Sequence, residues 1–216
     1  MLSYKDLKIK TSPDVYVPAE DSFLAAEAIR LWLSKVPEEG LSVLDMGSGS
    51  GILGLTAAKD PKVESVTFVD INDEALSLSS ANLELNRDSI NANASFIHSY
   101  LFENVKNIFD LIIFNAPYLV SGGEEGMLPK AWEGGLSGID LSKEFLGSAM
   151  SYLNPNGAII LVASSHSNLA SLLAEIGKKG FRILNEKKEH IFFEDIIVYT
   201  LIVNPNQHLS EYLFQG

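Results

Sequence analysis

A short apolar strand that runs directly into a glycine-rich turn is the feature that most restricts the fold of this chain. The strand is expected over residues 42–45, the turn carries Gly47, Gly49 and Gly51, and a helix is expected over residues 51–59. Glycine tolerates backbone angles that other residues avoid, and it lets a ligand approach the main chain closely. A strand, a glycine turn and a helix in this order are typical of α/β sheets that bind nucleotide-like cofactors.

An acidic residue ends each of the two strands next to this turn. Asp45 ends the first strand and is able to accept a hydrogen bond from a ligand amine. Asp70 ends the second strand, at the spacing where a carboxylate commonly binds the hydroxyls of a ribose. Residues 49–54 also satisfy the pattern G-x-G-x-x-G, so an NAD-dependent enzyme remains an alternative. A further alternative is that the glycines only form a tight turn.

Strands and helices alternate along most of the chain, which predicts a doubly wound, mostly parallel α/β sheet. We expect strands over 42–45, 65–70, 94–98, 109–114, 158–163, 180–187 and 196–203. We expect helices over 21–35, 51–59, 73–86, 139–152 and 167–178. The last two strands have no helix between them, so a hairpin should bring one antiparallel strand into the sheet. Asp21 or Ser22 is expected to cap the first helix and Asp73 the third.

Two irregular segments complete this outline. Residues 1–17 are expected to be irregular or extended, and a turn is expected over residues 154–157. Residues 115–137 are rich in Gly and Glu and are expected to form a long loop. A loop of that length inside a compact domain usually has a function. We expect one domain over residues 1–205, followed by a tail over 206–216 that resembles a protease-tag remnant.

Composition excludes several classes of function. The net charge of −12 disfavours a nucleic-acid partner, because proteins that bind duplexes usually present a basic face. Hydrophobic residues make up 46% of the chain, enough for a buried core, but no apolar run is long enough to span a bilayer. The chain has no cysteine, no recognisable signal peptide and no histidine spacing typical of metal ligands. We therefore expect a cytoplasmic protein without a metal or membrane partner.

The expected strand 109–114 ends in a group of residues suited to holding a planar NH2 group. The strand runs into Asn115, Ala116, Pro117 and Tyr118. The Asn115 side-chain oxygen can accept one N–H of such a group and the Ala116 carbonyl the other. The Tyr118 ring offers a face for packing. An amide or amine nitrogen would thus be presented to the cofactor at the sheet edge, although a simple strand-ending Asn-x-Pro turn is an alternative.

These segments together resemble the HemK-type class I S-adenosylmethionine methyltransferases that modify release-factor glutamine, and most closely their short archaeal and eukaryotic branch. The resemblance covers roughly residues 12–203 and rests on five motifs in the order of the family. The motifs are Val15-Tyr16-Val17-Pro18-Ala19-Glu20-Asp21-Ser22, the glycine turn 45–51, Asp70-Ile71-Asn72, Asn115-Ala116-Pro117-Tyr118 and Ala131-Trp132-Glu133-Gly134-Gly135. The resemblance implies a Rossmann-like sheet of about seven strands and S-adenosyl-L-methionine as cofactor.

The resemblance also implies roles for individual residues. The catalytic candidates are Asn115, Ala116, Pro117 and Tyr118. The cofactor-binding candidates are Tyr16, Ser22, Asp45, Gly47, Gly49, Gly51, Asp70, Ile71, Ser99 and Asn115. Two positions depart from the family: Ala116 stands where the family has its first proline, and Ser99 stands where it usually has an aspartate. We expect weaker preorganisation at the first position and a less firmly held adenine at the second.

The function that the resemblance implies is methylation of the Gly-Gly-Gln glutamine of a translation release factor. A small zinc-binding activator protein commonly accompanies the catalytic subunit in this branch. It would cover an apolar surface to which Phe96, Ile97 and Tyr100 are candidates to contribute. Two other functions remain open: an N6-adenine or other exocyclic-amine methyltransferase acting on RNA or DNA, and a non-catalytic cofactor-binding subunit.

Overall fold

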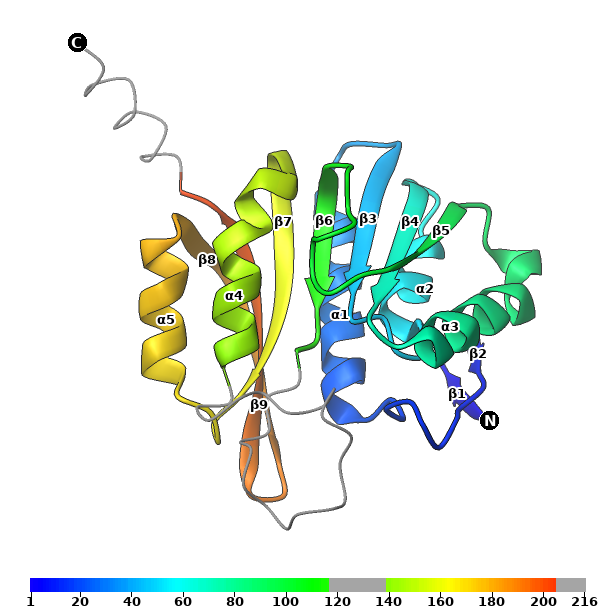
Figure 1. Ribbon diagram of the computed structural model, residues 1–216, viewed down its shortest axis with the longest axis horizontal. Coiled ribbons are helices and arrows are strands. Elements are labelled where there is room, and N and C mark those ends of the chain that lie inside the picture. The colour runs from blue at the N-terminus through cyan, green and yellow to red at the C-terminus, as the bar shows by residue number, and fades with distance from the viewer. Residues whose placement is uncertain (117–138, 205–216) are drawn as a thin grey trace.

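A seven-stranded sheet forms the centre of the molecule (Figure 1). The computed structural model describes residues 1–116 and 139–204. The strand order is β5-β4-β3-β6-β7-β9-β8, and β9 runs antiparallel to both of its neighbours while the other pairs are parallel. The strands are β3 (Leu41–Met46), β4 (Val63–Asp70), β5 (Asn93–His98), β6 (Phe109–Phe114), β7 (Leu153–Ser164), β8 (Phe181–Ile191) and β9 (Glu194–Val203). The predicted doubly wound sheet with a reversed strand near the C-terminus is confirmed.

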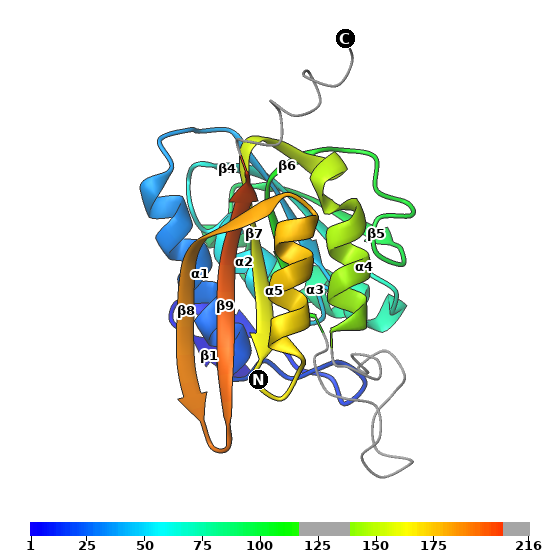
Figure 2. The same cartoon turned by 90° about the vertical axis from the view of Figure 1, so that its left-hand side faces the viewer.

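Helices cover both faces of this sheet. They are α1 (Glu20–Lys35), α2 (Ile52–Ala58), α3 (Asp73–Leu85), α4 (Asp140–Ala149) and α5 (Leu169–Lys178). The first three pack on one face, and α4 and α5 pack on the other (Figure 2). Successive residues of a strand point to opposite faces, so Leu111 and Ile113 join the core beside α1 and Ile112 and Phe114 join the core beside α4.

The predicted helix caps at α1 and α3 are wrong. The N-cap of α1 is Ala19, which makes no side-chain cap bond, and the N-cap of α3 is Asn72, whose side chain accepts from the Glu74 N–H. Asn is as good an N-cap as Asp, so composition alone did not separate Asn72 from Asp73. Asp21 does not cap the helix; its carboxylate accepts hydrogen bonds from Tyr16, Ser22 and Asn115.

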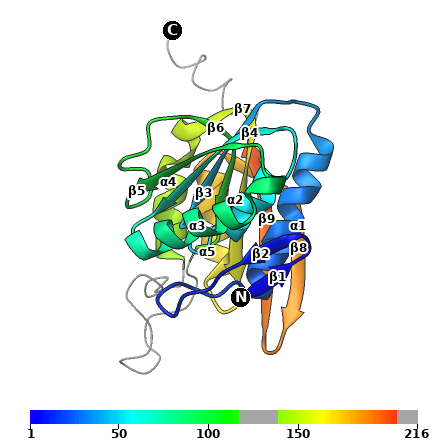
Figure 3. The same ribbon diagram turned by 90° about the vertical axis from the view of Figure 1, so that its right-hand side faces the viewer.

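The N-terminal segment is fastened to α3 by two asparagines. It begins with an antiparallel hairpin of β1 (Leu2–Tyr4) and β2 (Leu7–Ile9), seen beside α1 in Figure 3. The Asn82 side chain accepts from the Lys10 N–H at 2.7 Å and donates to its carbonyl at 3.1 Å. Asn86 makes the same pair of bonds with Lys8, at 3.0 and 2.8 Å. Each asparagine thus binds a backbone N–H and carbonyl of one residue, as a neighbouring strand would. These bonds hold the N-terminal segment that leads to the carboxyl ends of the strands.

A turn segment, rather than a helix, connects β5 to β6. It packs through Phe102, whose ring stacks on Tyr152 at 4.4 Å and on Phe145 at 5.3 Å between centroids. The turn predicted over residues 154–157 lies within β7 as an irregularity, because β6 advances from Phe109 to Leu111 while β7 advances from Leu153 to Ala158. Within the described ranges, no helix is long and apolar enough to cross a bilayer.

Candidate functional site

The site lies where the chain changes direction through the sheet, at the carboxyl ends of β3 and β6. The connection after β3 leads to β4 on one side, and the connection after β6 leads to β7 on the other. Open α/β sheets bind ligands at this switch point. Met46 pairs with Phe114 in register, so the next residues, Gly47 and Asn115, start from adjacent positions at the edge. The structure therefore brings together the two features that the sequence singled out.

The glycine turn adopts the backbone that its composition predicts. Gly47, Gly49 and Gly51 have φ values of 64°, 53° and 80°, in the left-handed region that favours glycine. The Gly49 N–H donates to Oδ2 of Asp70 at 2.9 Å. Val15, from the N-terminal segment, lies 3.8 Å from where a Cβ on Gly49 would be. The turn is thus held on one side by β4 and covered on the other by the N-terminal segment.

The Asp70 carboxylate at the end of β4 keeps capacity for a ligand. Its Oδ1 accepts from the Asn72 N–H at 2.9 Å, so each oxygen has at least one backbone donor. Each carboxylate oxygen has about two lone-pair sites, which leaves acceptors for ribose hydroxyls. Burial raises the pKa of Asp70, and the hydrogen bonds from Asn72, Gly49 and Ile71 lower it in part. The Ile71 side chain beside it is 50% exposed and offers an apolar surface next to the predicted ribose site.

Asp45 is more deeply buried than the sequence suggested. Only 1% of the residue is exposed, and its Oδ2 accepts from the Gly54 N–H at 2.8 Å. Burial raises the pKa of Asp45 to about 8, against the lowering effect of the Gly54 bond. A Cβ on Gly54 would lie 2.4 Å from Cε1 of Phe68, so only glycine lets α2 approach the sheet this closely. Asp45 therefore stabilises the start of α2 behind the glycine turn through the Gly54 N–H. Its predicted contact with a ligand amine stays a prediction.

The Asn115 side chain is held by a buried carboxylate from the first turn of α1. Its Nδ2 donates to Oδ2 of Asp21 at 2.9 Å, across 94 residues of sequence. Asp21 is 4% exposed, and its Oδ1 accepts from the Tyr16 hydroxyl at 3.1 Å and from the Ser22 N–H at 2.6 Å. A carboxylate is an acceptor only, so it fixes which end of the Asn115 amide faces it. The amide oxygen of Asn115 is therefore turned the other way.

Two buried oxygens at the site have no hydrogen-bond partner among the described residues. They are Oδ1 of Asn115 and the hydroxyl of Ser48, which lies in the glycine turn. Buried polar atoms are nearly always paired, so unpaired ones at a sheet edge call for a ligand. The Asn115 oxygen is an acceptor and fits a ligand N–H at the end of β6. The Ser48 hydroxyl can donate or accept and fits a polar cofactor group over the glycine turn.

Tyr16 and Ser22 contribute to the site through Asp21. The Ser22 residue is 3% exposed, and its hydroxyl donates to Asp21 at 3.2 Å. Burial, followed by the Asp21 charge, raises the pKa of the Tyr16 hydroxyl above its ordinary value. The hydroxyl therefore stays protonated as a donor to Asp21. The structure shows these residues as supports of Asn115, and their predicted contacts with the cofactor stay predictions.

Ser99 is buried after β5 and its hydroxyl is used within the chain. The hydroxyl donates to the Leu101 carbonyl at 3.0 Å and accepts from the Asn104 N–H at 3.0 Å. The Ser99 N–H donates to the Asp70 carbonyl at 3.0 Å, which places Ser99 next to the ribose candidate. A direct contact of this hydroxyl with adenine would have to compete with the turn that it closes.

Of the remaining predicted site residues, the structure describes only Ala116. Ala116 is 1% exposed and continues β6 directly. Pro117, Tyr118 and Trp132 lie outside the described residues, as does most of the predicted loop 115–137. Among residues 1–116 and 139–204, no group of three His, Cys, Asp or Glu side chains is placed to hold a metal ion.

A family comparison agrees with this arrangement. The model of the methyltransferase small domain family matches residues 6–192, which is most of the chain. The chain belongs to this family.

Relatives of this methyltransferase are found among proteins named for glutamine methylation. A Methanocaldococcus jannaschii protein that carries the name protein N5-glutamine methyltransferase is 31% identical over 201 residues, covering 92% of this chain and 96% of the relative. The eRF1 methyltransferase catalytic subunit mtq2 of Schizosaccharomyces pombe is 30% identical over 200 residues, covering 83% of this chain and 85% of the relative. The HemK-type resemblance seen in the motifs is confirmed.

A solved structure shows the same fold. The Mtq2 chain of the E. cuniculi Mtq2–Trm112 complex superposes with a TM-score of 0.65, covering 88% of this chain and 99% of that chain. The two sequences are 21% identical, so this likeness supports the class I methyltransferase fold and no finer property.

The sequence analysis missed three features of the candidate site. Asp21 was assigned to a helix cap because its contact with Asn115 joins residues 94 positions apart in the sequence and leaves no local signal. Ser48 was passed over between two glycines, although it is one of the two serines of that turn. Gly54 had a signal, since it is the last glycine of the G-x-G-x-x-G pattern, whose role is close packing of helix on sheet.

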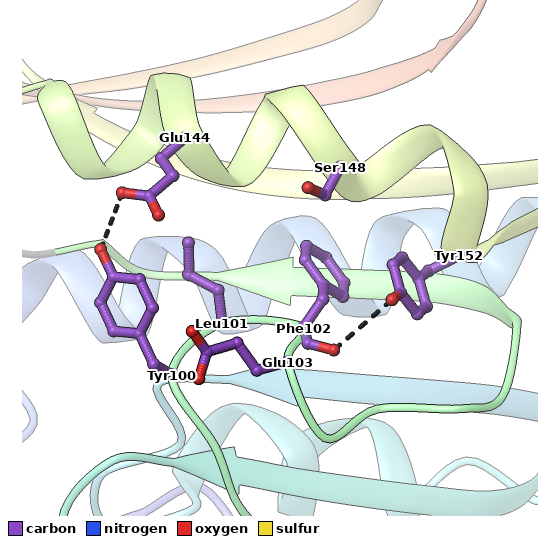
Figure 4. Close-up of a pocket in the computed structure, with 7 residues that line it drawn as sticks. All are labelled: Tyr100, Leu101, Phe102, Glu103, Glu144, Ser148 and Tyr152. Carbon is purple, nitrogen blue, oxygen red and sulfur yellow. Dashed lines mark hydrogen bonds between the residues drawn. The ribbon is translucent and has the colours of Figure 1, made fainter.

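The structure also has a hollow of about 240 Å³ (Figure 4). It is formed between the segment after β5 and helix α4, and is lined by Tyr100, Leu101, Phe102, Glu103, Glu144, Ser148 and Tyr152. The Tyr100 hydroxyl donates to Glu144 at 2.7 Å across its mouth. None of the candidate cofactor or amide-binding residues that the structure describes lines it, so these residues do not form the hollow.

Proposed function

We propose that this methyltransferase transfers a methyl group from S-adenosylmethionine to the side-chain amide nitrogen of a glutamine, in the Gly-Gly-Gln motif of a translation release factor. The observation that carries the proposal is the Asn115 amide, fixed by Asp21 with its oxygen unpaired beside the glycine turn. The names of the relatives from M. jannaschii and S. pombe support the choice of glutamine and of a release factor.

The residues at the end of β6 would align the accepting nitrogen. Oδ1 of Asn115 accepts one N–H of the glutamine amide, and the Ala116 carbonyl accepts the other. Both hydrogens are then directed at the protein, and the remaining face of the nitrogen is directed toward the cofactor. Positioning of this kind can supply a large part of a rate enhancement. The proton that the nitrogen loses on methylation would pass to solvent, so no side chain is assigned as a base.

The described residues fit S-adenosylmethionine at the glycine turn. Gly47 and Gly49 leave the backbone open, and the Ser48 hydroxyl supplies an unpaired polar atom. The free lone pairs of Asp70 suit ribose hydroxyls, and the exposed Ile71 suits the adenine face. When bound, the cofactor supplies an electrophilic methyl group on a sulfonium.

The proposal includes a small zinc-binding activator subunit at the β5 edge of the sheet. β5 pairs only with β4, so one side of its backbone carries no strand partner within the described sheet. Phe96 and Ile97 are half-buried on this strand, and Tyr100 after it is 37% exposed. An edge strand of this kind can accept a strand from another protein. The Mtq2 relative of known structure was solved in complex with Trm112, which supports this part of the proposal. Release-factor modification would take place in the cytoplasm.

The experiment compares wild type with Asn115→Ala on labelled S-adenosylmethionine and purified release factor, with and without an activator subunit. We expect label on the Gly-Gly-Gln glutamine with wild type only, and similar cofactor binding by both proteins in calorimetry. A release factor that lacks this glutamine is the substrate control.

Two results would contradict the proposal. Transfer to an RNA or DNA panel but not to the release factor would favour the exocyclic-amine alternative, since adenine also presents a planar NH2 group. No binding of S-adenosylmethionine by calorimetry would favour the non-catalytic subunit.

A further inference from the structure

The β8–β9 hairpin ends in two phenylalanines that are almost completely exposed. Ile191 pairs with Glu194, so Phe192 and Phe193 alone form the loop. Their exposed fractions are 84% and 91%, larger than that of any other large apolar side chain in the described part of the chain, Met1 at 81% included. Isolated exposed apolar residues are common, but two adjacent aromatic side chains at the tip of a hairpin form a concentrated apolar surface.

The backbone of this loop is unfavourable for its residues. Phe192 has a φ of 54°, in the left-handed region. Two-residue hairpin loops with a positive φ at the first position strongly prefer glycine there, because a side chain clashes with the backbone. A bulky aromatic residue at that position is a genuine outlier. Turn formation therefore does not explain why phenylalanine occupies the loop.

The hairpin tip is anchored to the end of β7. The His166 ring Nε2 donates to the Phe193 carbonyl at 3.1 Å, and the Ser164 hydroxyl donates to the Glu194 carboxylate. The Asp195 N–H donates to the Ser165 hydroxyl at 2.8 Å. These contacts hold the backbone of the tip against the end of β7, so the two phenylalanines are presented at a defined place on the surface.

The tip projects on the side of the molecule where the site lies. Figures 1, 2 and 3 show the β8–β9 hairpin extending beyond the end of β7, in the direction in which the parallel strands end. Glu194 is close enough to Tyr16 for its charge to contribute to the raised pKa of that hydroxyl. Tyr16 itself donates to Asp21, the partner of Asn115. A protein whose side chain reaches Asn115 would therefore approach the hairpin tip.

We propose that the tip formed by Phe192 and Phe193 is a docking surface for the protein substrate, and that it inserts into an apolar depression beside the methyl-accepting glutamine. The inference rests on the proposed function. Glu20 and Glu194 both lie close enough to Tyr16 for their charges to raise the pKa of its hydroxyl, so two carboxylates lie near the part of the site that faces the tip. The depression on the substrate should accordingly be bordered by lysine or arginine. This acidic setting and the net charge of −12 disfavour RNA or an anionic membrane as the occupant.

The test replaces the tip without disturbing the turn. The double variant Phe192→Gly with Phe193→Ser removes both rings and puts glycine where φ is positive, so its melting temperature should equal or exceed that of wild type. The matched control is Ile183→Ser with Leu184→Ser, which removes two partly exposed apolar side chains from the other end of β8. Labelled release factor is titrated with each protein by fluorescence anisotropy, and methyl transfer is measured on the release factor and on a short Gly-Gly-Gln peptide.

We expect the tip variant to raise the KM for the release factor and its dissociation constant by about 10- to 100-fold, as loss of an aromatic anchor does at other interfaces. Its kcat/KM for the peptide and its affinity for S-adenosylmethionine should equal those of wild type and of the control. Unchanged binding of the release factor, with methylation intact in wild type, would overturn the docking surface and leave the proposed function standing. A wild-type protein that neither binds nor methylates the release factor would overturn both. A tip variant that loses only self-association, RNA binding or vesicle binding would assign the tip to that other occupant and also overturn the proposal.

Discussion

Replacing Asp21 by asparagine should turn the Asn115 amide over, because it changes one atom of the network and keeps its shape. Oδ1 of Asp21 accepts from the Ser22 N–H at 2.6 Å and from the Tyr16 hydroxyl at 3.1 Å, so an asparagine would keep its carbonyl oxygen there. Its NH2 group would then replace Oδ2, which lies 2.9 Å from Nδ2 of Asn115. Two donors cannot share a hydrogen bond, so Asn115 would flip and present its NH2 group to the substrate.

The size of the effect follows from the bonds involved. In Asp21→Asn, the productive orientation of Asn115 would leave one buried hydrogen bond unmade and two donors facing each other. The free-energy cost of this orientation is about 2–4 kcal/mol. The kcat of Asp21→Asn should therefore fall by about 30- to 1,000-fold. Asp21→Ala leaves neither orientation favoured, so a large share of molecules keeps the productive one and kcat falls less. It leaves more buried donors unpaired, however, and should lose about 2–4 kcal/mol of unfolding free energy.

The assay is kcat at saturating cofactor and release factor, with urea unfolding and the dissociation constant of S-adenosylmethionine measured on the same proteins. We expect kcat to fall in the order wild type, Asp21→Ala, Asp21→Asn, and stability to fall in the order wild type, Asp21→Asn, Asp21→Ala. Cofactor affinity should change little in Asp21→Asn. If Asp21→Asn retains wild-type kcat, or if the alanine variant is the slower enzyme, the orientation of Asn115 by Asp21 is refuted.

Three further changes test the cofactor side of the site. Asp70→Ala should weaken S-adenosylmethionine binding by about 1–3 kcal/mol in calorimetry, because hydrogen bonds to a carboxylate are lost, and an unchanged constant would contradict the ribose role. The pKa of Asp45 is raised from 3.8 to about 8, so the native state keeps a proton that the unfolded state has lost and the free energy of unfolding should fall as pH rises between these values. Urea unfolding across this range should show the slope in wild type and a flatter profile in Asp45→Asn. Gly54→Ala would place a methyl 2.4 Å from the Phe68 ring and should reduce stability by about 1–3 kcal/mol. The matched change Gly177→Ala meets nothing within 4 Å in a helix and should add about 0.5–1 kcal/mol, so equal effects of the two would contradict the packing argument.

The fold was predictable because its signals are local. Each central strand is an apolar run with a turn or a helix after it, and the alternation of these elements is sufficient to predict a doubly wound sheet. The glycine turn and the end of β6 were recognisable for the same reason. Their adjacency followed from a general rule for parallel sheets, and the register of Met46 with Phe114 confirms it.

The missed features depend on contacts between distant segments. Nothing near Asp21 indicates that its carboxylate will meet Asn115, because a helix cap is an equally good use of an aspartate there. Asn82 and Asn86 likewise look like ordinary polar residues of a helix, and only the folded chain shows that they bind the backbone of residues 8 and 10. The exposure of Phe192 and Phe193 could not be read from sequence, where they extend an apolar strand pattern.

The attachment of the N-terminal segment to α3 sets an order in which parts of the candidate site can form while the chain is being synthesised. Lys8 and Lys10 cannot form their bonds to α3 until the chain has been synthesised through Asn86, and Asn115 follows later still. During synthesis the glycine turn is therefore made before the N-terminal segment can cover it. The covered turn is itself made before Asn115 is available. Under the proposed function, the residues that bind the cofactor would be in place before the residue that binds the substrate amide.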